Sequence, residues 1–152
     1  HQGNGTAELF AADDDVFTIS IHGDRNFPFA KVPGDIDVPL KDGTKDEEYL
    51  QALENALQQA PFGAVELAFY LAGADPFVGD RLGRLQLTKA GLAARDRLVL
   101  SICRAAGVPV AVAMAGGYAI DIEDIVDIHA ATVRIAAECH HGQFAAEVNV
   151  KW

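Results

Sequence analysis

The sequence predicts an α/β fold with a mainly parallel sheet and flanking helices. Three short apolar runs, at residues 15–23, 65–73 and 108–116, are typical of strands because β-branched or aromatic residues occur in them and each ends in glycine. Helical patterns separate these runs, and strands that alternate with helices form βαβ units with parallel strands. Half of the residues are apolar, which suits strands buried on both faces.

The first expected strand, residues 15–23, runs into a long loop. The segment from His22 to Gly43 holds three prolines, three glycines and two phenylalanines. Loops of this length inside a compact domain are usually functional or disordered. We therefore expect a long functional loop between the first strand and the first helix.

The first expected helix covers about residues 46–60. Thr44 and Glu47 have the spacing of a capping box at its start, and the helix stops before Pro61. Its apolar side chains share one face, as an amphipathic helix requires: Tyr49, Leu50, Leu53, Ala56 and Leu57. The second strand, residues 65–73, follows.

The second expected helix covers about residues 89–106 and has a signal at each end. Thr88 is placed to cap its start, and Gly107 is placed to cap its end. The third strand, residues 108–116, follows directly, and the last helix covers about residues 122–138.

Length and charge limit the classes of partner. Residues 1–152 are enough for one domain or part of one. The net charge of −10 argues against direct binding to nucleic acid, which needs a basic surface. The mean hydropathy is +0.11 without an unbroken run of membrane-spanning length, so we expect no membrane partner.

Cys103 and Cys139 lie far apart in expected helices, which indicates buried free thiols and a cytoplasmic location, or a nuclear one in a eukaryote.

Polar residues follow each of the three expected strands. In open α/β sheets, sites form beyond the carboxyl ends of the strands, which here are residues 20–22, 73–75 and 116–118. Small residues before Asp75 and Tyr118 allow other groups to approach closely. Each stretch alone is also compatible with an ordinary turn.

Together with His1, these side chains match the types of group that metal hydrolases use. Imidazole and carboxylate groups, as in His1 and Asp75, are zinc ligands, and a catalytic zinc keeps a position open for water or substrate. A tyrosine hydroxyl, as in Tyr118, can donate to the oxyanion that forms when a carbonyl is attacked.

Five ordered blocks resemble the C-terminal half of the zinc-dependent histone deacetylase family, which includes acetoin-utilisation proteins and acetylpolyamine amidohydrolases. The resemblance covers roughly residues 1–138 and rests on the blocks HQGNGT, SIHGDRNFPF, VPLKDGTKDEEYL, LAGADPFVGDRLGRLQLT and AMAGGYA. It implies part of an arginase/deacetylase-like fold, with a parallel sheet between two layers of helices. It also implies that residues 1–152 form a single partial domain, the C-terminal part of a catalytic domain.

The resemblance assigns roles to individual residues. It makes His1 and Asp75 zinc ligands and makes Tyr118 the tyrosine that hydrogen-bonds the substrate carbonyl beside the metal. The walls of the narrow acyl-lysine channel would be formed by Phe27 (or Phe29), Leu82, Gly116 and Gly117.

The resemblance also implies two sites for a monovalent cation, K⁺ or Na⁺. Ser20 and the carbonyl of Ile21 match the inner site, and backbone carbonyls near Phe10, Asp13 and Val16 match the outer one. Such cations are hard and prefer oxygen ligands, so carbonyl-rich turns suit them.

The implied function is that of a zinc-dependent amidohydrolase acting on acetyl-lysine in a protein or on an acetylated small amine. In the family, the other aspartate ligand and the paired general-base histidines precede the position of His1. We therefore expect a fragment that is inactive alone and whose partner is the missing N-terminal half of the same domain. The alternative is a noncatalytic α/β binding module that keeps only the fold.

Other departures and repeats carry less weight. Gln2 replaces a histidine common in the family, and Ala115 replaces the first glycine of a frequent Gly-Gly-Gly-Tyr run, which leaves the subclass open. His140 and His141 follow the last helix outside any motif, so we expect a surface or helix-end position. A solvated helix face explains three acidic residues spaced by three: Asp121, Asp124 and Asp127.

Overall fold

The computed structural model describes residues 1–143 and confirms the predicted α/β class. Its elements alternate along the chain in the order α1 (Asn4–Leu9), β1 (Ile19–Gly23), β2 (Ile36–Leu40), α2 (Asp46–Leu57), the 3-10 turn η1 (Phe62–Ala64), β3 (Ala68–Ala72), α3 (Lys89–Ala105), β4 (Val110–Met114) and α4 (Ile122–His140). Every strand pair is parallel, as the βαβ pattern predicts.

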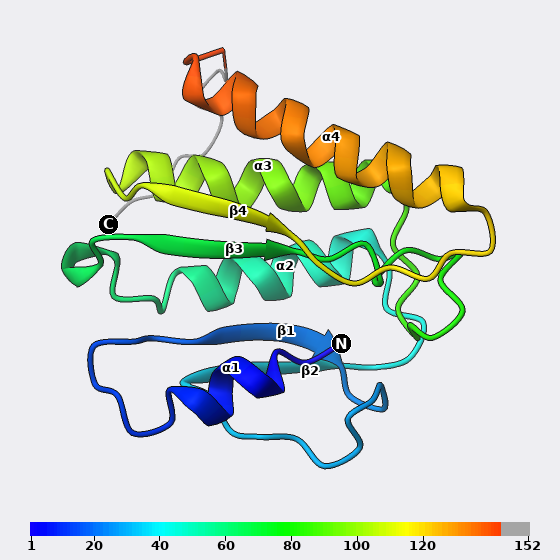
Figure 1. The fold of residues 1–152 in the computed structure, drawn as a ribbon, viewed down its shortest axis with the longest axis horizontal. Coiled ribbons are helices and arrows are strands. Elements are labelled where there is room, and N and C mark those ends of the chain that lie inside the picture. The colour runs from blue at the N-terminus through cyan, green and yellow to red at the C-terminus, as the bar shows by residue number, and fades with distance from the viewer. Residues whose placement is uncertain (144–152) are drawn as a thin grey trace.

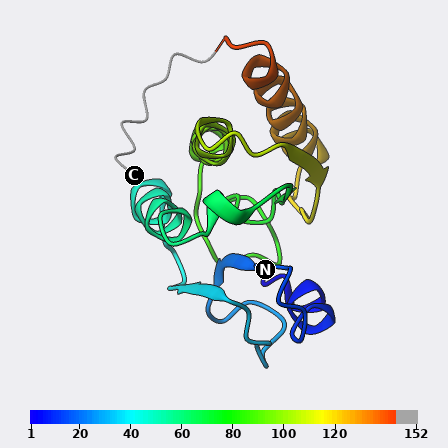
Figure 2. The ribbon, with the colours of Figure 1, turned by 90° about the vertical axis from the view of Figure 1, so that its left-hand side faces the viewer.

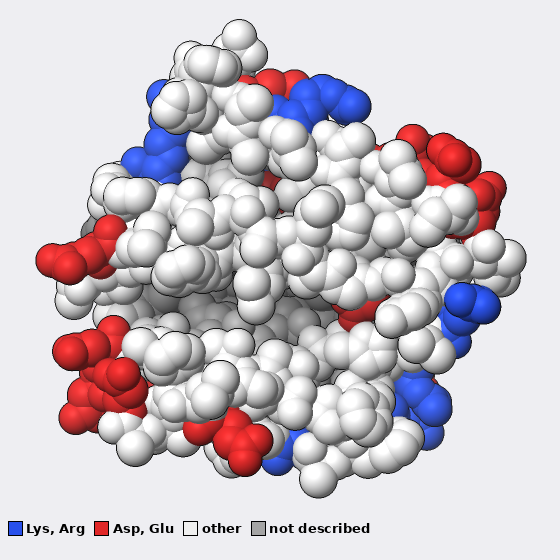
Figure 3. Space-filling model, viewed as in Figure 1, with Lys and Arg blue, Asp and Glu red and all other residues white. Residues whose placement is uncertain are grey.

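The described strands form two parallel pairs. In one, β1 pairs with β2 from Ile19↔Ile36 to Gly23↔Leu40, and in the other β3 pairs with β4 from Ala68↔Val110 to Ala72↔Met114. All four strands point the same way, and β1 faces β3 without pairing (Figures 1 and 2). The surface is hollowed between the two pairs (Figure 3). The carboxyl ends of the strands therefore meet on one side of the molecule.

The structure corrects the prediction of an unbroken loop from His22 to Gly43, because β2 lies within it. Pro39 lies inside β2. Proline removes a ladder donor and is tolerated only at sheet edges and strand ends, so its presence argued against a strand in the sequence. Helix α1 was also missed: it has no side-chain cap, and glycines precede and interrupt its six residues. The first strand begins at Ile19 rather than at residue 15.

The helix ends agree with the sequence in part. Thr88 caps α3 as predicted, with its hydroxyl accepting from the N–H of Gly91 at 2.9 Å, and Gly107 follows the helix at φ +72°. The capping box predicted for α2 is wrong, because Lys45 occupies the cap position and makes no side-chain bond to the helix. The Thr44 hydroxyl is buried without a partner in the described structure.

The core lies on one face of β3 and β4, where α2 and α3 pack (Figure 2). Alternate residues of β3 point to opposite faces, so Ala68 and Tyr70 pack against this core. Phe69 and Leu71 point away from it and are 74% and 54% exposed. A parallel sheet is normally covered on both faces, whereas within residues 1–143 this second face is an exposed apolar surface.

Both cysteines are buried and free, as the sequence predicts. Burial raises the pKa of the Cys103 thiol to about 11, so it stays protonated at neutral pH and is a poor nucleophile. Among the described helices, none combines the length and apolar character needed to cross a membrane.

Candidate functional site

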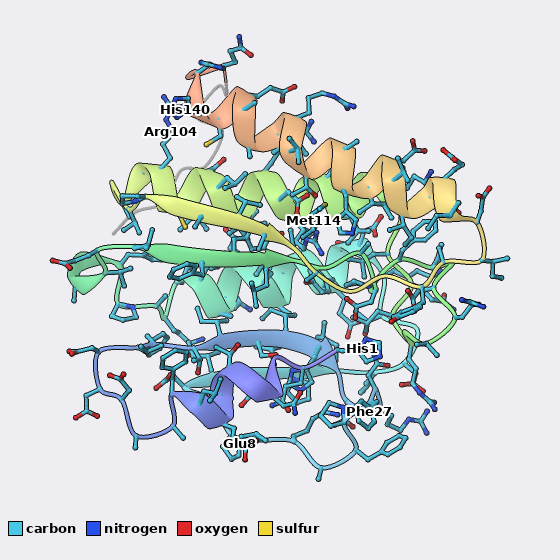
Figure 4. The ribbon with its side chains drawn as sticks, in the orientation of Figure 1. His1, Glu8, Phe27, Arg104, Met114 and His140 are labelled. Atoms are coloured by element: carbon cyan, nitrogen blue, oxygen red, sulfur yellow. The ribbon has the colours of Figure 1, made fainter. Side chains whose placement is uncertain are left out.

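His1 and Asp75 meet at the carboxyl ends of the strands. The Nδ1 atom of His1 lies 2.6 Å from Asp75 Oδ2, and the amino group of His1 forms an ion pair with the same oxygen. The side chain of His1 lies at this end of the sheet, beside the end of β1 (Figure 4). Two residues 74 positions apart in the sequence are thus brought together at one point.

The start of the chain is held by Gln2, which sequence reasoning treated only as a departure. Its amide donates to the Val32 carbonyl at 2.7 Å and to Asp37 Oδ1 at 3.0 Å, and it accepts from the Val32 N–H at 3.1 Å. Gly3 donates to Ser20 Oγ at 3.4 Å. These bonds connect the first residues to β1, β2 and the loop between them, and thereby fix His1.

The turn after β3 brings the carboxylate of Asp75 close to two glycines. The N–H groups of Ala74 and Asp75 both donate to the carbonyl of Gly116, at 2.5 and 3.1 Å. A Cβ at Gly73 would lie 2.6 Å from Asp75 Oδ1, and one at Gly116 would lie 3.4 Å from it. Small residues here are needed so that the loops after β3 and β4 can approach the carboxylate.

A third glycine, Gly83, contacts the backbone of Asp75. A Cβ at Gly83 would overlap the Asp75 carbonyl oxygen, which is backbone and cannot move aside cheaply. We therefore expect Gly83→Ala to displace Asp75 and to lower the free energy of unfolding by about 1–3 kcal/mol, as overpacking does. Thermal unfolding of this variant beside Gly63→Ala, where a Cβ meets nothing within 4 Å, measures the effect. Equal stability of the two variants would contradict it.

Asp80 fixes the turn that carries Tyr118. Its carboxylate accepts from the N–H groups of Leu82 at 2.8 Å, Gly83 at 2.6 Å and Tyr118 at 2.5 Å. The Tyr118 carbonyl accepts from the N–H and Nε of Arg81, at 3.0 and 3.2 Å. This role of Asp80 was not predicted from the sequence, although a Gly-Asp pair in a turn signals such side-chain-to-backbone bonds.

The backbone of Tyr118 is fixed, while its side chain is 56% exposed. The neighbouring Gly117 is turned inward, since a Cβ there would lie 3.0 Å from Ala74 Cβ and 2.9 Å from Ile125 Cδ1. Gly117 thus lets the loop after β4 pack on Ala74, which is fully buried. Its place on a channel wall stays a prediction.

The proposed channel walls are on the surface. Phe27 and Phe29 are 67% and 80% exposed and lie edge to face, with centroids 6.0 Å apart. The loop that carries them is held by Lys31, whose ammonium donates to the carbonyls of Asn26 and Pro28 at 2.6 and 2.5 Å. Phe27 lies on the same side of the molecule as His1 (Figure 4). Leu82 is also exposed, so the role of these residues as a channel remains a prediction.

The residues of the expected inner cation site lie within β1, and those of the outer one lie between α1 and β1. Ser20 Oγ lies 3.0 Å from His22 Nδ1, and His22 is buried beside it, which lowers the pKa of its imidazole. The Phe10 carbonyl accepts from the Asp13 N–H at 3.0 Å, and the Asp13 carbonyl accepts from the Val16 N–H at 3.2 Å. Each carbonyl keeps a second lone pair. The cation roles of these groups, including the carbonyl of Ile21, stay predictions.

The donors at His1 and Asp75 fit zinc chemically, because imidazole and carboxylate are among its usual ligands. A catalytic zinc takes three protein ligands. Within residues 1–143, no group of three or more His, Cys, Asp or Glu side chains is arranged to hold a metal. The described part of the chain therefore offers two donors of a zinc site.

The remaining sequence features lie at the surface, as expected. His140 is exposed in the last turn of α4, and His141 follows it. Asp121 caps α4 by accepting from the Glu123 N–H at 3.0 Å. Asp124 and Asp127 form ion pairs with the partly exposed Lys89, at 2.7 and 2.6 Å.

Comparison with known proteins identifies relatives over most of the chain. Residues 1–134 match the family model of the histone deacetylase domain. An uncharacterised protein of Picosynechococcus sp. is 47% identical over 92% of this chain and 47% of its own length. Histone deacetylase 2 of Arabidopsis thaliana is 34% identical over 78% of this chain, and acetylpolyamine amidohydrolase of Mycoplana ramosa is 33% identical over 79%. The chain spans about half the length of these relatives or less: 47%, 32% and 38%.

Solved structures show the same fold. An acetylpolyamine aminohydrolase from Burkholderia pseudomallei matches 91% of this chain with a TM-score of 0.77 at 20% identity, and the match covers 43% of that protein. An HDAC homologue from Aquifex aeolicus matches 90% of this chain with a TM-score of 0.65 at 23% identity, and the match covers 39% of that protein. At such identities the likeness concerns the fold alone.

Proposed function

The chain belongs to the histone deacetylase domain family, and on that premise we propose that it forms the C-terminal part of a zinc-dependent amidohydrolase. The proposed reaction removes the acetyl group from acetyl-lysine in a protein or from a related acetylated amine. The observation that carries the proposal is the 2.6 Å contact between His1 Nδ1 and Asp75 Oδ2 at the carboxyl ends of parallel strands. In a noncatalytic module these side chains could have turned apart, so the contact supports the enzyme.

His1 and Asp75 would hold the metal in this proposal. Zinc supplies Lewis acidity at the amide carbonyl and a water of lowered pKa. The backbone N–H of Tyr118 donates to Asp80 Oδ2 at 2.5 Å, which fixes this part of the turn. The Tyr118 hydroxyl would donate a hydrogen bond to the oxygen that gains charge when the carbonyl is attacked. K⁺ or Na⁺ at Ser20 and Ile21 would stabilise the strand end beneath the site.

The proposed partner is the rest of a histone deacetylase domain. The facing edges of β1 and β3 are unpaired in the described structure, and both strands run in the same direction (Figure 1). Residues 1–3 already connect them, since Gly3 contacts Ser20 in β1 and His1 contacts Asp75 after β3. A further parallel strand between them would satisfy both edges, and its attached helices would cover Phe69 and Leu71. Relatives about twice as long are consistent with such a complement.

We further propose a cytoplasmic location, or a nuclear one in a eukaryote, because buried free thiols persist in reducing compartments. The substrate would be an acetylated protein or small amine rather than nucleic acid, given the net charge of −10.

Zinc binding by the chain tests the proposal. We expect the parent chain to bind zinc weakly through His1 and Asp75, and Asp75→Ala to abolish measurable binding because one of two donors is removed. Asp14→Ala, which removes an exposed carboxylate elsewhere, is the matched control and should bind as the parent does. Titration calorimetry with zinc gives the three affinities. Unchanged affinity in Asp75→Ala would remove Asp75 from the metal site.

A further inference from the structure

A buried ion pair lies on α3 beneath the end of β3. Arg95 and Asp96 are only 4% and 1% exposed. The Nε and Nη2 atoms of Arg95 donate to Asp96 Oδ1 at 2.9 and 2.8 Å. Asp96 also accepts from the hydroxyl of Tyr70 in β3 at 2.5 Å and from that of Thr132 in α4 at 2.6 Å. The pair thus connects α3, β3 and α4.

The third nitrogen of the Arg95 guanidinium reaches the metal-site turn. Its Nη1 donates to the carbonyl of Gly73 at 2.6 Å, two residues before Asp75. The guanidinium carbon also lies 5.8 Å from the centroid of the Tyr70 ring. The rigid fork of Arg95 is therefore held on one side by Asp96 and presents its remaining nitrogen, Nη1, to Gly73.

The Asp75 turn is held from two opposite directions. Arg95 binds the carbonyl of Gly73, while the carbonyl of Gly116 binds the N–H groups of Ala74 and Asp75, at 2.5 and 3.1 Å. Two peptide groups before the Asp75 side chain are thereby fixed. A buried ion pair contributes little net stability, because desolvation offsets its Coulombic attraction. The specific effect of this pair is to hold the Nη1 atom of Arg95 at the carbonyl of Gly73.

We propose that Arg95 is a positioning residue for the metal site: by holding the Gly73 carbonyl it fixes the Asp75 carboxylate where it meets His1. The inference rests on the proposed function for the identity of the metal. Residues that orient a ligand typically contribute a factor of about 10–100 to metal affinity. Arg95 would act in this way through the backbone.

Arg95→Lys separates positioning from stability. A lysine ammonium keeps the charge opposite Asp96, but a single nitrogen cannot reproduce the fork that reaches both Asp96 and Gly73. We expect Arg95→Lys to bind zinc about 10–100-fold more weakly than the parent chain. We also expect faster amide hydrogen exchange at Ala74 and Asp75, measured without metal.

Thr132→Val is the matched control, because it removes another buried donor to Asp96 and does not touch Gly73. It should destabilise the fold while leaving zinc affinity and exchange at Ala74 and Asp75 as in the parent, at a temperature where all variants are folded. If Arg95→Lys and Thr132→Val change the zinc affinity and the exchange at Ala74 and Asp75 by the same amount, Arg95 is merely structural and the inference is overturned.

A replacement variant covers a failure to fold, and hydrogen exchange covers the case in which the parent chain binds no zinc. If Arg95→Lys fails to fold, Arg95→Met, which keeps the aliphatic stem and removes every donor, takes its place under the same two expectations. If the parent chain binds no zinc, the proposed function fails for this chain. Hydrogen exchange at Ala74 and Asp75 then decides the positioning role by itself, and parent-like exchange in the Arg95 variants overturns it.

Discussion

The isolated 152-residue chain is expected to hydrolyse no acetyl-lysine peptide above the uncatalysed background and to bind less than one zinc per chain. Its described residues provide two donors, His1 and Asp75, without a third side chain placed to complete the site. Of its other histidines, His22 is buried against Ser20, and His129, His140 and His141 belong to α4 or follow it. Loss of a general base alone costs a factor of about 10²–10⁴.

The same chain is expected to self-associate. Phe69 and Leu71 on β3 and Met114 on β4 are more than half exposed, and the facing edges of β1 and β3 are unpaired in the described structure. Apolar faces and free strand edges promote association between chains.

Three measurements test these two expectations. Light scattering after gel filtration gives the mass, metal analysis gives the zinc content, and acetate release gives the activity. A monodisperse monomer with stoichiometric zinc and clear turnover would falsify the expectation that this chain needs a complement.

The periodic parts of the fold could be predicted from the sequence. Strands β3 and β4 are short apolar runs followed by glycine, and α3 carries a Thr88 cap and a following Gly107, so local signals were sufficient. Strand β2 was missed because Asp37 and Pro39 interrupt its apolar pattern. Asp37 accepts a hydrogen bond from the Gln2 amide. A contact between such distant segments is not visible in local periodicity.

The site could be predicted as far as strand ends determine it. The rule that side chains after parallel strands converge selected Asp75 and Tyr118, while His1 entered only as an imidazole that could join Asp75 in binding zinc and through the family resemblance. The residues that hold the turns were not predicted. Asp80 and Arg95 act through hydrogen bonds to backbone groups of Tyr118 and Gly73. Such partners are set by tertiary packing, so sequence spacing alone does not reveal them.

In a catalytically competent assembly that contains this chain, Tyr118→Phe is expected to lower kcat by about 10²–10³, the cost of removing one oxyanion donor. Tyr118 is 56% exposed, and its backbone N–H rather than its side chain is bound to Asp80, so we expect the substitution to remove the donor without moving the turn. KM and zinc content should change little, because the lost bond strengthens only as the oxyanion forms. Ile120→Ala, an 86% exposed position on the same loop, is the matched control and should keep parent kinetics. Steady-state assays with an acetyl-lysine peptide separate kcat from KM. A Tyr118→Phe variant that retains more than about a third of the parent kcat would exclude the hydroxyl from the reaction, since oxyanion donors contribute far more than that.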